Sequence, residues 1–575
     1  MYLRQIPNKE TGRTFLSILH GYWDPVAKQS RTKTIKKIGY LDEMEKLYAD
    51  PIAHFEAMAA AMDEERKASK NVTITLDMDE QLERSAANRK NYGHVVFSMI
   101  YHELEIDRFL KNARRHENFK FNTDAIMRLL VFSRLLFPGS KRETVLNKEL
   151  FFDSFNFTLD NVYDALTHFD KVSDALQKHL HEQITKQYGR DTDLVYYDVT
   201  NYYFEIDKQD DLRKRGPSKE KRKDPIVQMG LLLDKLGLPI SYKLFPGNKH
   251  DSQTLMPVLT EIKKKYDVGR IIVVADKGLN SGDNIAYNTA LGDGYIYSKS
   301  IRGASKDFKK WVLDEKGYRY RGDKYKLKSK VVPDAVISIT VEQNGTYKKK
   351  KKITVEQKWI VFYSEKYAER AKYKREEAVA KARAIIKNPA KYRICFDYGA
   401  AGYIENLKVN KETGEIVNIC DTLTLNEKKI EEEEKYDGYY SIITSELDEK
   451  DESVIDLYTG LWHIEESFKV TKSVLEARPV FLRREDHINA HFLTCFMALL
   501  IARIVEMRLG GKYLIERITE TLSNVACSHL DQNLWLFDYA NDVTDEINAV
   551  FGTNFGKKTM TLQEIKKCLG NAKNR

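Results

Sequence analysis

Two aspartates and one glutamate occupy positions where their side chains could bind divalent cations. Asp198 ends the apolar run DLVYYD, Asp276 ends the run GRIIVVAD, and Glu465 lies on a helix predicted over residues 458–473. Carboxylate oxygens suit Mg²⁺ and Mn²⁺, and a pair of such ions can activate an attacking hydroxyl and stabilise the leaving oxygen of a phosphodiester. These residue types predict metal-assisted phosphoryl transfer.

The helix predicted over residues 458–473 has two faces. Tyr458, Glu465 and Lys472 are seven residues apart, so they share one face. An apolar set at i, i+3 and i+4 spacing predicts the buried face: Leu457, Leu461, Ile464, Phe468 and Leu475. The alternative, from this segment alone, is a plain polar flank on which Glu465 pairs with Lys469.

The aspartates would be positioned by a predicted α/β core. DLVYYDVTNYYFEI, IVQMGLLLD and PISYKLFPG predict an antiparallel meander, and DSQTLMPVLTEIKKKY predicts a helix. GRIIVVAD then predicts a buried strand, followed by a short helix and the strand YIYSKSI, and YDGYYSIITSEL (436–447) is expected to return to the same sheet. This order of elements is that of an RNase H-like domain, in which the third carboxylate comes from a helix after the fifth strand.

Six regions are predicted along the chain. Alternating residues within 1–45 predict two or three strands, helical periodicity dominates residues 91–188, and a charged, strand-rich segment interrupts the core. Within the helical region, SKRETVLNKEL and FTLDNVYDALTHFDKV are either a DNA-binding helix pair or part of a plain bundle. The expected boundaries are 1–60 (β-rich region and linker), 61–190 (helical, candidate DNA-binding region), 191–302 (first part of the core), 303–435 (β-rich insertion), 436–510 (second part of the core) and 511–575 (helical).

The composition is that of a globular protein with several domains. The chain has 575 residues, of which 42% are hydrophobic and 31% charged, and its net charge of +9 implies local basic patches rather than a basic field over the whole molecule. Five scattered cysteines without a C-x-x-C pair suggest neither a zinc site nor a disulfide framework. The apolar run from Phe492 to Met507 is short for a membrane span and contains Arg503, so we predict a buried core helix and no membrane partner.

Three segments together resemble the DDE-type transposases of bacterial insertion sequences: YDVTNYYFE, IIVVADKGLNS and YTGLWHIEESFKVTK. The last is similar to the signature Y-x2-R-x3-E-x6-K of one branch of these enzymes. Further similarity lies in GPSKEKRKDPIVQMGLLLDKLGLPISYKLFPGNKHDSQTL, in GYLDEM and in RPVFLRREDHINAHF, so it extends over most of the chain.

The resemblance implies roles for particular residues. It makes Asp198, Asp276 and Glu465 the catalytic metal ligands, with Glu466 as the rival of Glu465, and it implies two Mg²⁺ ions that Mn²⁺ can replace. It makes Tyr458 and Lys472 contacts to DNA phosphates. Where the signature has arginine this chain has Leu461, so that role is either absent or taken by Lys469, His463 or Arg478.

Aromatic and basic residues elsewhere are further candidates for DNA contacts. In some relatives an aromatic side chain of the insertion stacks on a flipped base, which makes Trp311 and Trp359 candidates, although core packing is the alternative for each. The run LRKRGPSKEKRKD and the lysines 348–352 could contact phosphates or could be solvated loops. The candidates in the first run are Arg213, Arg215, Lys219 and Arg222.

The expected function is metal-dependent cleavage of transposon ends and strand transfer into target DNA by a cut-and-paste route. Two alternatives remain open: a catalytically inactive DNA-binding relative, and a metal-dependent nuclease without strand transfer. The resemblance implies double-stranded DNA as partner, with terminal inverted repeats and target DNA as the two substrates. It also implies a homodimer that pairs two ends, and a location in the bacterial cytoplasm at the nucleoid.

Overall fold

The computed structural model describes the chain except residues 9–10, 25–28, 69–78, 80, 82–86, 116, 217–223, 267, 323–324, 344–346, 389–397, 410–415, 419–422, 531–532 and 575. It consists of two compact units, Met1–Ala86 and Ala87–Arg575, and each is described by itself. The three carboxylates all belong to the second unit.

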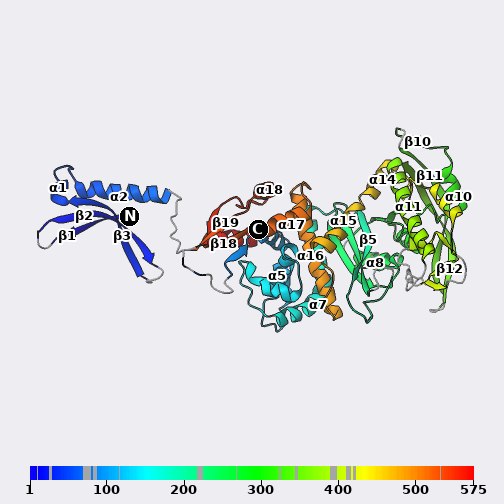
Figure 1. Cartoon of the computed structure of the whole chain (residues 1–575), viewed down its shortest axis with the longest axis horizontal. Helices are drawn as coiled ribbons and strands as arrows, with labels where there is room; N and C mark the ends of the chain where they lie inside the picture. Colours follow the sequence, from blue (N-terminus) through cyan, green and yellow to red (C-terminus); the bar gives the residue numbers. More distant parts are fainter. Residues whose placement is uncertain are drawn as a thin grey trace. The chain divides into compact units, whose positions relative to one another are not determined.

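The first unit is a three-stranded antiparallel sheet with helices, as the alternation in residues 1–45 predicts (Figure 1). Its elements are β1 (Tyr2–Pro7), β2 (Thr14–Asp24), β3 (Gln29–Tyr40), α1 (Leu41–Met44) and α2 (Pro51–Ala68). Leu16 and Ile18 of β2 are fully buried, and Phe55 and Ala59 of α2 are buried too. The unit therefore has a small apolar core of its own.

The second unit begins with a helical region. It contains α3 (His94–Glu103), α4 (Ile106–Ala113), α5 (Thr123–Leu136), α6 (Lys141–Leu146), a 3₁₀ turn (Asn147–Leu150) and α7 (Leu159–Tyr188). Thr158 and Asn161 form a capping box at the start of α7, and Gly189 ends the helix with φ +65°, a conformation that glycine adopts at little cost. These signals define the long helix on which α16 (Glu485–Arg508) packs.

Helix α16 is the buried core helix that the run from Phe492 to Met507 predicts. It is long and apolar enough to pass a composition test for a membrane span, but 94% of its apolar window is buried inside the protein. Its surroundings include α7, α5 and α3. This packing favours the plain bundle over a DNA-reading helix pair for residues 140–173, because α7 has thirty residues and its apolar stripe lies in the core.

A nine-stranded mixed sheet forms the centre of the second unit, in the order β10-β11-β12-β17-β9-β8-β5-β6-β7. The strands predicted for the core are β5 (Leu194–Tyr203), β6 (Ile226–Asp234), β7 (Pro239–Pro246), β8 (Ile272–Ala275), β9 (Gly294–Ser298) and β17 (Tyr439–Thr444). Strands β5, β6 and β7 form the predicted meander, and β8 and β9 run parallel to β5. The predicted order of three strands, helix, strand, helix and strand is confirmed, with α8 (Leu255–Lys265) and α9 (Gly282–Ala290) as the helices.

The two faces of this sheet belong to different cores. Tyr196 and Val274 point into the core that contains α16, whereas their neighbours Val195 and Val273 pack with α8 and α9. Because side chains alternate along a strand, Asp198 lies on the Tyr196 face, and Asp276 lies on the Val274 face. Both aspartates therefore face the side that carries the C-terminal helices.

Residues 303–435 add strands to the same sheet. Long strands β11 (Tyr325–Gln343) and β12 (Tyr347–Ser364) pair with each other, and β12 pairs with β17. The other elements of the segment are α10 (Lys306–Leu313), β10 (Arg319–Tyr320), α11 (Glu365–Lys387), α12 (Tyr398–Ala401), β13 (Ile404–Glu405), β14 (Lys408–Val409), β15 (Ile416–Asn418), β16 (Thr424–Leu425) and α13 (Glu427–Glu434). Figure 1 shows α10 and α11 beside β10, β11 and β12. The insertion is thus continuous with the core sheet.

The remaining elements follow β17 or close the chain. Helices α14 (Asp451–Thr459) and α15 (Trp462–Lys469) precede α16. A small sheet combines β4 (Arg89–Asn91) from the start of the second unit with β18 (Ala526–His529), β19 (Leu534–Phe537) and β20 (Thr559–Thr561) from its end. Helices α17 (Ile515–Asn524), α18 (Asp542–Phe551) and α19 (Leu562–Lys573) complete the unit.

Candidate active site

Asp198 lies on β5, and Asp276 directly follows the neighbouring parallel strand β8. The pairing of β5 with β8 runs as far as Tyr196 and Val274, and each aspartate is two residues further along the chain. Continuing this register past the end of β8 brings the two aspartates close together on one face of the sheet. Both are partly exposed, so their carboxylates can reach a ligand from solvent.

Two hydroxyl groups orient Asp276. Ser298 donates a hydrogen bond to its Oδ1 over 2.8 Å, and Tyr458 donates one to the same oxygen over 3.4 Å. The hydroxyls of Tyr440 and Tyr458 are 2.7 Å apart, and burial raises the pKa of Tyr458 well above its usual range, so this phenol remains protonated. The sequence reasoning missed Ser298 and Tyr440. Ser298 ends the strand beside Asp276, and that position was the signal that could have identified it.

The prediction of one continuous helix over residues 458–473 is wrong. Helix α14 ends at Thr459, α15 begins at Trp462, and a π-helical turn, η4 (Val470–Val474), follows. Between the two helices the backbone bonds tighten to i to i+3, for example from the Leu461 N–H to the Tyr458 carbonyl over 3.0 Å. Tyr458, Glu465 and Lys472 consequently belong to three different pieces of helix.

Gly460 explains why the helix changes geometry at this point. A Cβ atom built at Gly460 would lie 2.0 Å from the Tyr196 hydroxyl oxygen, so the chain passes closer to the end of this tyrosine side chain than a residue with a Cβ could. Farther along, the Tyr202 hydroxyl lies 2.7 Å from the Thr471 hydroxyl. The segment from Gly460 to Thr471 therefore runs along β5 in the direction of the strand.

The rises of strand and helix place Glu465 at about the same distance along β5 as Asp198. Asp198 is two residues beyond Tyr196, about 7 Å along the strand. Glu465 is five residues beyond Gly460, about 7 Å along a helix. Helix α15 contacts β5, and the Glu465 side chain is exposed.

Glu466 is committed to a different interaction. Its carboxylate accepts a hydrogen bond from Arg503 of α16 over 3.2 Å, and Arg503 also donates to Glu506 and Ser467. Glu465 is exposed, whereas Glu466 is partly buried in this network. Of the two glutamates, Glu465 is the one available to a ligand, and Glu466 anchors α15 to α16.

The three carboxylates are of the ligand type that a divalent cation needs. Carboxylate oxygens are the hard ligands that Mg²⁺ and Mn²⁺ prefer, and Asp198 and Asp276 are neighbours with solvent access. Within the described residues, no three histidine, cysteine, aspartate or glutamate side chains come close enough to hold one ion. The aspartate pair fits a cation by chemistry and register, and Glu465 lies level with it but is not gathered into the same cluster.

Leu461 occupies the buried face, as the periodicity predicts. It is 7% exposed and packs in the main core with Ile464 and Phe468. Among the residues considered in place of the signature arginine, His463 is half-buried, and burial together with Arg503 lowers its pKa, so it is largely uncharged at neutral pH. Lys469 is exposed, and the Arg478 guanidinium lies 5.5 Å from the Tyr203 ring centre at the end of β5.

The other predicted DNA contacts differ in their position and in whether they are paired within the protein. Lys472 is partly buried, and its ammonium lies 5.7 Å from the centre of the Tyr202 ring, beside the site. Arg213 is paired with Asp210 and donates to the Leu482 carbonyl over 3.3 Å, and Arg215 donates to the Asp207 carbonyl. Lys219 and Arg222 lie outside the described residues.

Trp311 and Trp359 pack against each other and against Phe308. Their ring centres are 6.0 Å apart, and the Lys330 ammonium is 4.9 Å from each ring centre. Trp359 also donates its indole N–H to Gln357 over 3.1 Å. Both rings remain partly exposed, so the cluster combines core packing with an open, cationic edge.

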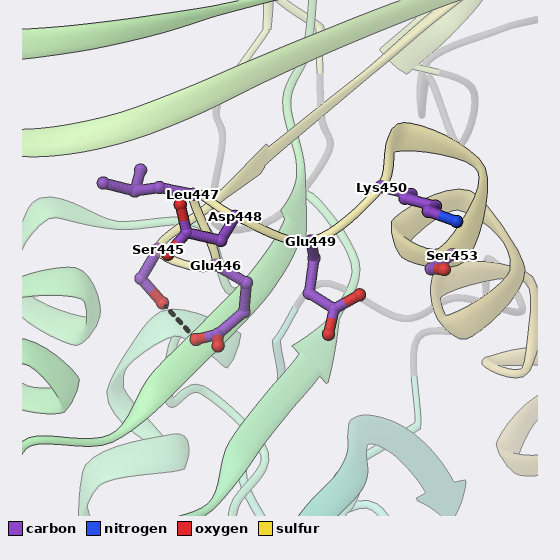
Figure 2. Close-up of a pocket in the computed structure, with 7 residues that line it drawn as sticks. All are labelled: Ser445, Glu446, Leu447, Asp448, Glu449, Lys450 and Ser453. Carbon is purple, nitrogen blue, oxygen red and sulfur yellow. Dashed lines mark hydrogen bonds between the residues drawn. The ribbon is translucent and has the colours of Figure 1, made fainter.

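A cavity of about 590 Å³ lies away from this site (Figure 2). It is lined by residues 445–450 and by Ser453, and Figure 2 shows Ser445 hydrogen-bonded to Glu446. The Ser445 N–H donates to the Tyr295 carbonyl near the start of β9, whereas Ser298 and Asp276 lie at the opposite ends of their strands. Its acidic lining and its position separate it from the aspartate pair.

Comparison with known families agrees with this geometry. Residues 203–501, more than half of the chain, match the family described as Transposase DDE domain, and residues 3–72 match IS1634 family transposase, N-terminal domain. Asp276 and Glu465 lie within the first match, and Asp198 lies just before it. The comparison with curated proteins finds no match. The chain belongs to the DDE transposases of insertion sequences, which carry out DNA transposition.

Proposed function

We propose that this transposase cleaves the ends of its element and joins them to target DNA by a cut-and-paste route. The proposal rests on Asp198 and Asp276, which follow the last paired residues of the parallel strands β5 and β8, and on Glu465 of α15. Transposition by a DDE enzyme needs acidic residues that converge from distant parts of the chain. We propose that these three carboxylates do so here.

The proposed cofactors are two Mg²⁺ ions, for which Mn²⁺ can substitute, held by Asp198, Asp276 and Glu465. When bound, such ions activate a water or a 3′-hydroxyl for attack and stabilise the leaving oxygen at phosphorus. The protein's own contribution is orientation. Ser298 and Tyr458 hold one oxygen of Asp276, which leaves its other oxygen for a ligand.

The side chains around the carboxylates are proposed to hold DNA. Lys472 and Arg478 lie along the end of β5, where their cations can bind phosphates, and Lys469 is exposed on α15. Tyr458 and the lysine-flanked pair Trp311 and Trp359 are further proposed contacts, the tryptophans as stacking surfaces for an unpaired base. Arg213, Arg215, Lys219 and Arg222 are further proposed phosphate contacts.

The proposed substrates are the terminal inverted repeats and the target duplex, and the proposed assembly is a homodimer that pairs two ends. The site of action would be the bacterial cytoplasm at the nucleoid. The domain boundaries predicted from the sequence, including the insertion over 303–435, are kept as part of the proposal.

Cleavage of labelled element-end DNA with Mg²⁺ or Mn²⁺ tests the assignment. Asp198→Ala, Asp276→Ala and Glu465→Ala should each reduce the cleavage rate by more than the roughly 10- to 100-fold typical of outer-shell partners, because each removes a direct ligand. A joining assay with plasmid target then distinguishes strand transfer from simple nuclease activity. Unchanged cleavage in all three variants would refute the proposed site.

Glu466→Gln is the matched control for Glu465→Gln. Both substitutions neutralise one carboxylate on neighbouring residues of α15, but Glu466 is occupied by Arg503. We expect cleavage to persist in Glu466→Gln and to be lost in Glu465→Gln. The opposite result would exchange the roles of the two glutamates.

A further inference from the structure

We infer that one flank of helix α11 is a docking surface for duplex DNA on one side of the scissile phosphate. This inference rests on the proposed function, since it assumes that the carboxylates act on DNA. The surface, here called the α11 row, consists of Lys366, Arg370 and Lys374, with Tyr367 and Tyr373 beside them.

The α11 row is a continuous basic face. Its three cations are four residues apart, so they lie within an arc of about 80° and span about 12 Å along the helix. All three are exposed, and Tyr367 and Tyr373 are 46% and 64% exposed. Two exposed carboxylates border the row: Glu369 lies three residues beyond Lys366, and Glu377 lies one turn beyond Lys374. The buried residues of α11, Arg375, Ala382 and Ile385, lie on another side.

The cations of the row are not neutralised within the protein. In the part of the chain that the structure describes, no carboxylate forms an ion pair with Lys366, Arg370 or Lys374, whereas the buried Arg375 pairs with Asp437 and Glu434. Exposed, unpaired cations are complementary to the phosphates of a duplex, and the tyrosine hydroxyls beside them can donate to phosphate oxygens. A duplex carries one negative charge per roughly 1.7 Å of its axis, so even a short helix face meets several phosphates.

Aromatic contacts connect the row to the active site. The Tyr367 ring centre lies 6.3 Å from that of Tyr440, and Tyr440 lies 5.7 Å from Tyr458. Tyr458 in turn donates to Asp276. The first turn of α11 is therefore linked to Asp276 through two tyrosines, and we infer that the rest of the row leads away from it. DNA bound along it would extend from the scissile phosphate in one direction.

Salt-dependent binding of the full-length protein to a fluorescein-labelled random-sequence duplex tests the inference. The measurement is made in EDTA, so it does not depend on cleavage. Lys366→Gln/Arg370→Gln/Lys374→Gln should lower affinity at low salt by at least about 10-fold and reduce the slope of log K against log salt by about 2.7, because three phosphate contacts are removed.

The opposite flank of α11 provides a control of equal charge. Lys372→Gln/Arg383→Gln/Lys387→Gln removes three exposed cations from the same helix and should leave the salt slope nearly unchanged. Equal slopes for the two triple variants would overturn the inference, as would an unchanged slope in the row variant. Lys366→Arg/Lys374→Arg keeps the charge and should bind like the parent.

The two proposals can fail separately. If the row variant shows the lower slope while the parent does not cleave element ends, the proposed function fails and the docking surface stands. If cleavage depends on Asp198 and Asp276 but the row variant binds normally, only the docking surface is refuted.

Discussion

The hydrogen bonds around Asp276 show how the protein orients this proposed metal ligand. Ser298 and Tyr458 both donate to its Oδ1, and Tyr440 shares a hydrogen bond with Tyr458. Neutral donors on one carboxylate oxygen fix its orientation without neutralising its charge. The side chain is therefore oriented with one oxygen engaged, which is compatible with its proposed role as a metal ligand.

We predict that Ser298→Ala weakens metal use without affecting DNA binding. The substitution removes the 2.8 Å bond to Asp276, so the Mn²⁺ concentration that gives half-maximal cleavage should rise about 10-fold, as expected for the loss of an outer-shell partner. The measurement is a metal titration of cleavage, with DNA affinity determined separately in EDTA. Ser298→Thr keeps the hydroxyl and should behave like the parent. A metal requirement unchanged in Ser298→Ala would show that this bond has no positioning role.

At the scale of elements, the sequence predicts the order of the strands and helices of the core. It does not predict the break in the helical segment that crosses them. Asp198 and Asp276 each follow an apolar run, and period-two patterns separate strands from helices. The break at Gly460 depends on the Tyr196 hydroxyl, which is distant in sequence and adjacent only in the fold. No local spacing contains that information, and the seven-residue repeat of Tyr458, Glu465 and Lys472 suggested a regularity that the backbone does not have.

The close approach at Gly460 gives a second prediction. Gly460→Ala places a methyl group 2.0 Å from the Tyr196 oxygen and 2.6 Å from its ring carbon, so the buried Tyr196 ring or the start of α15 must shift. We expect a loss of about 1–3 kcal/mol in unfolding free energy, typical of overpacking, and a lower cleavage rate because Glu465 moves with the helix. Thermal unfolding and cleavage assays measure the two effects.

The same substitution in α19 is the control. Gly570 is also helical, but a Cβ there meets no atom within 4 Å, so Gly570→Ala should stabilise the protein by about 0.5–1 kcal/mol through helix propensity alone. If Gly460→Ala were as stable and active as the parent, the contact with Tyr196 would not limit the position of α15.

At the scale of the whole molecule, the charge pattern of the sequence does not distinguish among the candidate DNA-binding surfaces. The net charge of +9 implies local basic patches but does not say where they lie, and the run 212–224 and the helix at 366–387 are both rich in lysine and arginine. The structure distinguishes their described residues, since Arg213 is paired with Asp210 and Lys366, Arg370 and Lys374 are exposed. Which cations are consumed by internal pairs is a property of the fold, because the partners come from other parts of the chain.

Removal of the N-terminal unit tests how the functions are divided. The carboxylates, the α11 row and the main apolar core, which begins at Tyr92, all belong to residues 87–575. A chain of residues 87–575 should therefore fold with nearly the same unfolding midpoint as that part of the full-length protein. It should also retain Mn²⁺-dependent cleavage of random-sequence duplex DNA. The measurements are thermal unfolding followed by circular dichroism and gel-based cleavage. Since residues 3–72 match a separate transposase domain, we expect its removal to reduce the preference for element ends over random duplex. A truncated chain that folds but cannot cleave any duplex would show that the first unit contributes to the chemistry itself.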